Sequence, residues 1–242
     1  MSVIAFGVFG GGGDSDSAAA TTTSEAASGD GTTTVPDGAT TTTVPGTDTS
    51  VTLADGGTDG AIPSVGDPIP LNDLKMSADD IGPLDFGDDG DEVLGRLVAT
   101  FGQPTDDTGF FVGSGSFGEC PGDGIRVVRW GPLNVVIKGQ PGDSEFVSYR
   151  LDLRYGGLSS DTTDISTLSG LRVSDTVEEL TTIYASFYIE YVVDEDAGLV
   201  FVLKESQNAP VLLWGPVESQ APDARVTGIY SPNSCQTQAA TG

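Results

Sequence analysis

The stretch IGPLDFGDDGDEVLGRLVATFGQP, residues 81–104, decides the fold because it predicts one helix with two defined ends. Asp89 and Glu92 have the spacing of a capping box, in which each side chain accepts a hydrogen bond from a backbone N–H at the helix start. Gly102 and Pro104 are typical of a helix end. The helical repeat places a set of apolar residues on one face between these ends: Val93, Leu94, Leu97, Val98 and Phe101.

A second stretch, LSGLRVSDTVEELTTIYASF (residues 168–187), repeats this pattern. Its predicted capping pair, Asp175 and Glu178, lies 86 positions after Asp89 and Glu92. Its predicted apolar face consists of Val177, Leu180, Ile183, Tyr184 and Phe187. Because the pattern recurs with its cap and its apolar face, it indicates an internal repeat of two related units.

Each predicted helix is followed by runs typical of β-strands. After the first helix these runs are GIRVVRW (124–130), LNVVIKG (133–139) and EFVSYRLDLRY (145–155). After the second they are YIEYVV (188–193), LVFVLKE (199–205), PVLLWGP (210–216) and ARVTGIY (224–230). In the run 145–155, alternation predicts one buried side (Tyr149, Leu151, Leu153, Tyr155) and one outward side (Arg150, Asp152, Arg154).

The predicted fold class is therefore α+β. Two helix-plus-antiparallel-sheet repeats, residues 66–160 and 161–236, are expected to form one pseudo-twofold domain, followed by a disordered tail at 237–242. The capped helix start and the Gly-x-Pro exit resemble the helix-plus-sheet repeats of β-lactamase inhibitory proteins and of outer-membrane assembly lipoproteins. The second unit lacks the Gly-x-Pro exit after Phe187. This resemblance implies a protein that binds other proteins and has no catalytic residues.

The first 65 residues have a different composition from the rest of the chain. Residues 2–9 form an apolar run far shorter than the ~20 residues that span a bilayer, so no integral membrane span is predicted. Val8-Phe9-Gly10-Gly11 resembles the junction of a bacterial lipoprotein, although Gly11 stands where the lipidated cysteine would be. Residues 1–14 are thus interpreted as the remnant of an export or anchor signal; the alternative is an apolar N-terminus without a role.

Residues 15–65 are rich in Thr, Pro, Gly and Asp, and contain TTTVP at 32–36 and again at 41–45. So few apolar residues cannot offset the entropy of ordering, and the segment is predicted to be a disordered stalk. A signal remnant and a stalk favour an extracytoplasmic protein, either secreted or held at the cell surface or envelope.

The composition excludes several chemistries. The chain of 242 residues has no histidine, which removes His-based triads and His-ligated metals. Its two cysteines, Cys120 and Cys235, are too few for a Cys-only zinc site and suit one disulfide in an oxidising compartment. The alternative is two buried thiols in a cytosolic protein. A net charge of −26 opposes binding to nucleic acid and to anionic membranes.

Two motifs suggest ligands but lack the context that those ligands require. Gly113–Gly118 matches G-x-G-x-x-G, but ECPGDG follows it where a dinucleotide site needs a helix, so a flexible loop is expected. The acidic run 85–92 lacks the residue spacing of a calcium-binding loop. No metal, cofactor or catalytic residue is predicted.

The best candidate for a binding surface is the strand region between Gly124 and Tyr155. It holds five basic and three acidic residues, a local net charge of +2 in a strongly acidic chain. The candidate binding residues are Arg126, Arg129, Arg150 and Arg154, which are expected to dock carboxylate or phosphate groups of a partner. The alternative is that these arginines pair with neighbouring carboxylates.

Together these features predict a monomeric, exported cell-envelope or secreted protein that binds an envelope protein or polymer and is not an enzyme. The competing interpretation is a carboxylate-dependent, glycosidase-like hydrolase, since the 36 acidic residues include many possible pairs. A hydrolase of this kind should show a concave pocket with one carboxyl group of raised pKa among aromatic side chains.

Overall fold

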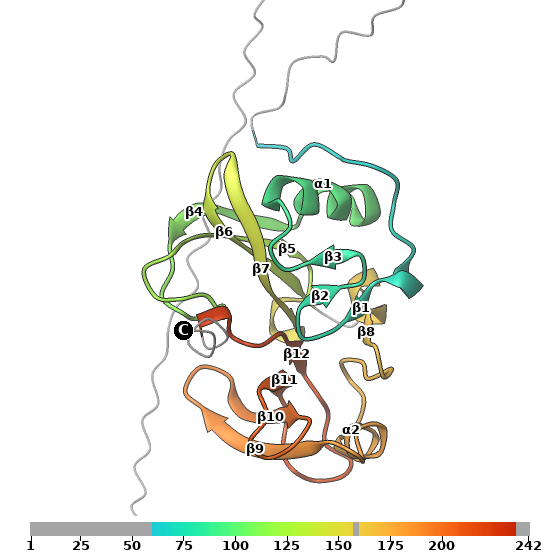
Figure 1. Ribbon diagram of the computed structural model, residues 1–242. Helices are drawn as coiled ribbons and strands as arrows, with labels where there is room; N and C mark the ends of the chain where they lie inside the picture. Colours follow the sequence, from blue (N-terminus) through green and yellow to red (C-terminus); the bar gives the residue numbers. More distant parts are fainter. Residues whose placement is uncertain (1–59, 157–159, 236–242) are drawn as a thin grey trace, which may run out of the picture. The chain divides into compact units, whose positions relative to one another are not determined.

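A computed structural model describes residues 60–156 and 160–235, which fold as an α+β unit (Figure 1). The predicted fold class is confirmed at this level. The predicted signal remnant at 1–14, most of the predicted stalk at 15–65 and the predicted tail at 237–242 lie outside the described residues.

The described part contains two α-helices, α1 (Gly90–Phe101) and α2 (Val177–Ile183). Eight strands form an antiparallel sheet in the order β4-β5-β6-β7-β12-β11-β10-β9. Their bounds are β4 (Asp106–Val112), β5 (Gly124–Trp130), β6 (Leu133–Gln140), β7 (Asp143–Asp152), β9 (Tyr188–Asp194), β10 (Gly198–Lys204), β11 (Val211–Pro216) and β12 (Gly228–Tyr230). A small mixed sheet has the order β3-β2-β1-β8, with bounds β1 (Lys75–Met76), β2 (Asp80–Ile81), β3 (Leu84–Asp85) and β8 (Ser166–Thr167). Three short 3-10 helices complete the structure: η1 (Leu71–Asp73), η2 (Leu153–Tyr155) and η3 (Asp161–Asp164).

The large sheet joins strands from both halves of the chain. β4 to β7 pair in sequence order, as do β9 to β12, and the two sets meet where β7 pairs with β12. Leu151 lies opposite Ile229 at this join, and Arg150 lies opposite Tyr230. The two sheets of three or four strands that the sequence predicts are therefore one continuous sheet, because the last strand of each set pairs with the other.

Helix α1 begins and ends where its sequence predicts. The Asp89 side chain accepts a hydrogen bond from the backbone N–H of Glu92 at 2.9 Å, and the chain leaves the helix at Gly102 with a φ of 79° that favours glycine. The predicted apolar face is buried at Val93, Leu94, Leu97 and Val98, with Phe101 partly buried. Burying this face attaches α1 to the sheet.

The predicted capping pair of α2 is wrong by one residue. Thr176, not Asp175, caps the helix: its side chain accepts from the N–H of Glu179, whose carboxylate accepts from the N–H of Thr176. Asp175 instead accepts from the N–H of Arg172, which closes the turn before the helix. The helix is only 7 residues long, so Phe187 lies beyond its end.

Most of the predicted strands are present, with differences at their ends. β5 has the bounds of GIRVVRW, whereas β7 ends at Asp152 and continues as the 3-10 helix η2, which leaves Tyr155 exposed. β12 is reduced to three residues. β4 was not predicted because a shift in register between Asp107 and Phe110 breaks its alternation.

Residues 60–65, predicted to be the end of the stalk, are ordered and lie against α1. Ile62 is buried, and its N–H donates to the Gln103 side chain at 3.1 Å. The Val65 N–H donates to the Gly95 carbonyl at 3.0 Å. The predicted boundary at residue 65 is wrong because this segment covers apolar surface of the helix.

The large sheet has a different environment on each face. The helix face contacts α1, α2 and the small sheet and buries the main hydrophobic core, which includes side chains from both halves of the sheet. The second face carries a smaller cluster of Ile125, Val127, Val136 and Val147 under Phe117. Phe117 belongs to the loop 113–123, and a disulfide between Cys120 and Cys235 ties this loop to the chain after β12. The predicted disulfide is confirmed.

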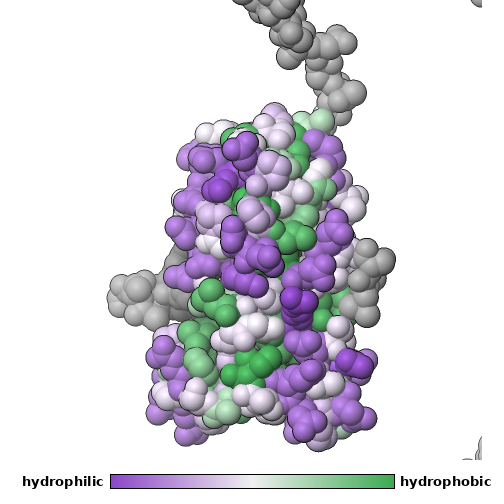
Figure 2. All heavy atoms as spheres, turned by 90° about the vertical axis from the view of Figure 1, so that its right-hand side faces the viewer, coloured by the Kyte–Doolittle hydropathy of each residue, from purple (hydrophilic) through white to green (hydrophobic). Residues whose placement is uncertain are grey.

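No helix among the described residues is long and apolar enough to cross a membrane. Viewed from the right-hand side of Figure 1, the surface is mostly hydrophilic, with smaller hydrophobic areas between the polar ones (Figure 2).

Candidate functional site

The second face of the large sheet carries one row of side chains that crosses all eight strands. Adjacent members of the row are register partners on neighbouring strands. In order from β4 to β9 the row is Asp106, Arg129, Asn134, Arg150, Tyr230, Trp214, Val202 and Glu190. Side chains paired in this way share one face, so the row brings predicted and unpredicted residues together.

Arg150 occupies the centre of this row within a group of aromatic rings. Its guanidinium carbon lies 4.7 Å from the centroid of the Tyr230 ring, 5.2 Å from that of Trp214 and 5.9 Å from that of Phe117. These distances are within the range of cation–π attraction. Because Trp214 lies two strands away from β7, the Arg150 side chain extends over Tyr230 toward β11.

Arg150 lies on the predicted side of its strand but is not solvated. The residue is 8 % exposed, so the predicted exposed position is wrong. The reason is that rings from β11, β12 and the loop 113–123 cover it, and the sequence of β7 alone does not show them. No side chain or backbone oxygen in residues 60–156 and 160–235 forms a hydrogen bond or ion pair with the guanidinium.

Burial lowers the pKa of the Arg150 guanidinium, and the charges of Tyr230, Tyr155, Glu119 and Asp152 oppose this shift. Arginine remains a cation after a shift of this kind. The two nearby carboxylates are already bound: Glu119 accepts backbone N–H groups of its own loop, and Asp152 accepts from other side chains. Arg150 is thus a buried cation without a contacting anion in the part of the chain that the structure describes.

Two of the other candidate arginines lie near Arg150 and have partners. Arg129 donates to Asp106 at 2.5 Å and stacks over the exposed ring of Tyr155 at 4.7 Å. Arg154 donates to Asp152 at 2.9 Å and to the Tyr230 hydroxyl at 3.0 Å. These ion pairs match the alternative interpretation, in which the arginines pair with neighbouring carboxylates.

Arg126 does not belong to this group. It alternates with Ile125 and Val127 and therefore lies on the helix face of β5. Its guanidinium makes two hydrogen bonds to Asp107, at 2.9 Å and 2.6 Å. These bonds hold the pKa of the Asp107 carboxyl below its usual value.

The loop that contains Gly113–Gly118 covers this site. The Glu119 carboxylate accepts the N–H groups of Gly115 and Phe117 at 2.6 Å and 2.8 Å, and the Gly118 carbonyl accepts from Ser234. With the disulfide, these bonds hold Phe117 over Arg150. As the sequence predicts, no helix follows this loop. The loop is, however, tethered at several points.

A small pocket lies beside this group, on β9, β10 and β11. Its volume is about 150 Å³, and it is lined by Val192, Asp194, Val200, Val202, Val211, Trp214 and Asn233. The Asn233 Oδ1 is buried and has no hydrogen-bond partner among the described residues. Trp214 and Asn233 are not among the predicted site residues. The recurrence of Trp-Gly-Pro at 130–132 and 214–216 is a sequence signal for Trp214, and Asn233 has none.

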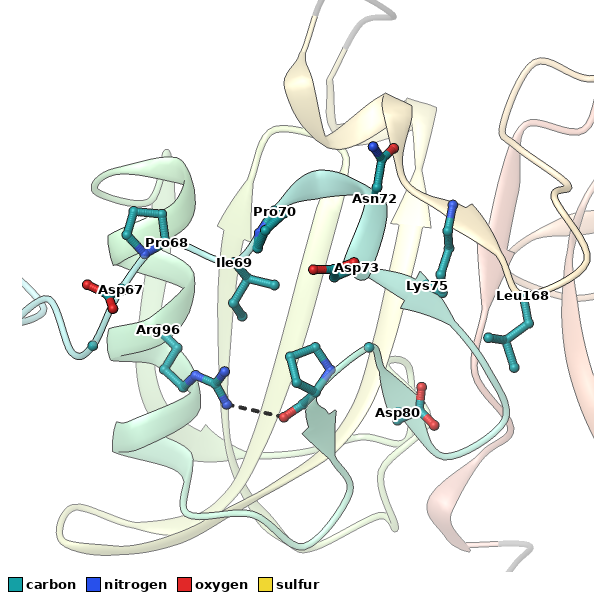
Figure 3. Close-up of a pocket in the computed structure, with 13 residues that line it drawn as sticks. Asp67, Pro68, Ile69, Pro70, Asn72, Asp73, Lys75, Asp80, Arg96 and Leu168 are labelled. Carbon is teal, nitrogen blue, oxygen red and sulfur yellow. Dashed lines mark hydrogen bonds between the residues drawn. The ribbon is translucent and has the colours of Figure 1, made fainter.

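A second cavity, of about 970 Å³, is open and lies between α1, η1 and the small sheet (Figure 3). Asp73, Lys75 and Asp80 line it, and Arg96 donates to the Pro83 carbonyl at its edge. Burial, followed by the charges of Asp79 and Asp85, raises the pKa of the Asp80 carboxyl. The cavity therefore meets part of the expectation for a hydrolase, but its lining contains no aromatic side chain.

In the described part of the chain, no group of three or more Asp, Glu or Cys side chains is placed to hold a metal ion. The chain matches no protein-family model, and neither a curated protein nor a solved structure shows significant similarity to it.

Proposed function

We propose that the chain is an exported cell-envelope or secreted protein that binds a partner without chemical turnover, through the second face of its large sheet. The observation that carries this proposal is that Arg150, which has no anion partner among the described residues, contacts Trp214, a residue that lines the small pocket on β9–β11. An isolated buried charge costs free energy unless an anion or a set of hydrogen bonds compensates it. A carboxylate or phosphate of a partner would provide that compensation.

Two features support an extracytoplasmic location. The disulfide is typical of an oxidising compartment. The first 65 residues have the composition of a stalk. The net charge of −26 favours an envelope protein or a polymer over nucleic acid as the partner. We also interpret the two meanders, β4–β7 and β9–β12, as related units of one pseudo-twofold domain.

The proposal is tested by measuring how much of the full, monomeric chain is retained on envelope material from the organism that makes it. Arg150→Lys keeps the charge but removes the planar group that stacks between rings. Arg129→Lys is the matched control, since Arg129 lies in the same row and already has a carboxylate partner. We expect salt-sensitive retention that weakens in Arg150→Lys and persists in Arg129→Lys. Equal retention of both variants and the parent would contradict the proposed face.

A second candidate function, a carboxylate-dependent hydrolase, is favoured only by the raised pKa of Asp80 in the larger cavity. A protonated carboxyl group there would serve as a general acid. This function predicts release of reducing ends from envelope polysaccharide by the parent and none by Asp80→Asn. The binding function predicts no release by either protein.

A further inference from the structure

The pocket on β9–β11 and the unpaired Arg150 meet at one side chain, Trp214. The Trp214 ring lines the pocket and also lies 5.2 Å from the Arg150 guanidinium carbon. The Trp214 Nε1 donates to the Ser231 carbonyl at 2.8 Å, and its ring packs edge-on against Tyr230. Trp214 is therefore held in place, and it contacts both the pocket, which it lines, and the Arg150 guanidinium, which is not itself part of the lining.

We propose that this site binds a carboxylate joined to a small branched aliphatic group. The aliphatic group would occupy the pocket, and the carboxylate would receive the N–H groups of Arg150. This assignment rests on the proposed binding function and specifies its ligand chemistry.

The size of the pocket limits what enters it. Sites for drug-sized ligands measure roughly 300–1,000 Å³, so about 150 Å³ has room for one small side chain. Val200, Val202 and Val211 form its walls, and these β-branched side chains have few rotamers with which to adapt. A group about the size of a valine side chain fits this shape and chemistry.

One polar feature explains why the group should carry a carboxylate. The Arg150 guanidinium has five N–H donors and no acceptor among the described residues, and a planar guanidinium pairs with a carboxylate through two parallel hydrogen bonds.

One carboxylate, that of Asp194, lines the pocket. Its Oδ1 accepts the N–H groups of Asp196 and Ala197, at 3.0 Å and 2.8 Å, in the turn between β9 and β10. These charge-assisted hydrogen bonds compensate part of its negative charge. Glu190, the member of the row on β9, pairs with Lys204 at 2.5 Å.

This chemistry has two possible sources, a free branched acid and the C-terminus of a peptide that ends in valine. Titration calorimetry of the full chain with isovalerate, acetyl-Ala-Val and acetyl-Ala-Val-amide distinguishes them. If the source is a peptide, acetyl-Ala-Val binds more tightly than isovalerate. For either source, we expect acetyl-Ala-Val-amide to bind about 10- to 100-fold more weakly than acetyl-Ala-Val, because the amide cannot form the charged hydrogen-bonded pair with Arg150.

Two variants locate the binding site. Val202→Phe fills the pocket, and Arg150→Gln removes the cation; each should reduce acid binding at least tenfold. The control, Arg126→Gln on the helix face, should leave it unchanged, and circular dichroism checks that each variant is folded. If Arg150→Gln does not fold, the comparison of acetyl-Ala-Val with acetyl-Ala-Val-amide on the unaltered protein still tests whether the site binds a carboxylate.

Equal affinity for acid and amide, or no binding of either at millimolar concentration, would overturn this assignment. Retention on envelope material that persists in that case would leave the proposed function standing. Acid binding by a chain that is not retained on envelope material would reject the proposed function and keep the ligand assignment.

Discussion

The buried Asp152 carboxylate accepts a hydrogen bond from the Tyr230 hydroxyl across the join between β7 and β12. Burial and the Asp152 charge raise the pKa of that hydroxyl, so it remains a donor at neutral pH. Arg154 donates to both groups. Two strands from distant parts of the chain are thus joined by side-chain as well as backbone hydrogen bonds.

Asp152→Ala should destabilise the fold by about 2–3 kcal/mol, because the Tyr230 hydroxyl is left buried without its acceptor. Asp106→Ala, which removes the half-exposed partner of Arg129, should cost less than about 1 kcal/mol. Urea denaturation of both variants measures the difference. Equal losses would show that the join does not depend on Asp152.

Loss of the disulfide should destabilise the fold by about 4–5 kcal/mol in the chain-entropy model, since Cys120 and Cys235 are separated by 115 positions. Chemical denaturation with and without reductant measures this loss. Thiol titration of the denatured, unreduced chain should find no reactive thiol, and two reactive thiols would contradict the bond.

Gly95→Ala should displace residues 60–66 from α1. A β-carbon at Gly95 would lie 2.4 Å from the Val65 Cγ2 and 3.0 Å from the Pro63 carbonyl oxygen, although alanine favours the helix itself by about 1 kcal/mol. Amide hydrogen exchange should become faster at 60–66 and remain slow at Leu94 and Leu97. Unchanged exchange at 60–66 would indicate that this segment does not depend on close contact with the helix.

Asp80 should make the fold less stable as pH rises. Its pKa is raised above 3.8 in the folded protein, so the folded state holds this proton more tightly than the unfolded state. The resulting stability is present below about pH 3.8 and is lost as pH rises through the folded pKa. Asp80→Asn should flatten this part of the stability curve, which urea titrations between pH 3 and 7 record. A curve identical to that of the parent would contradict the shift.

The sequence predicts the elements that have strong local signals. Helix α1 has its Asp89 cap, its apolar face and its terminal glycine within 14 residues, 89–102, and the structure reproduces these three features, whereas the Glu92 side chain does not complete the predicted capping box. β5 and β9–β11 are rich in β-branched and aromatic residues and lie between turn residues, and their bounds differ from prediction by at most one residue. The disulfide follows from having only two cysteines.

The features that the sequence does not predict depend on contacts between distant segments. Arg150 is covered by rings from positions 117, 214 and 230, and alternation within β7 only assigns it to a face. The strands β1, β2, β3 and β8 are two residues each, too short to form a periodic pattern. Asp175 and Thr176 are both good capping residues, and tertiary contacts around the turn select Thr176.

The proposed binding surface is the second face around Arg150 and Trp214. Hydrogen exchange of the full chain, with and without saturating solubilised envelope material, tests this most directly. We expect slower exchange in β10, β11 and the loop 113–123, and unchanged exchange at residues 66–83 around the larger cavity. Protection confined to residues 66–83, or no protection in any segment, would contradict it.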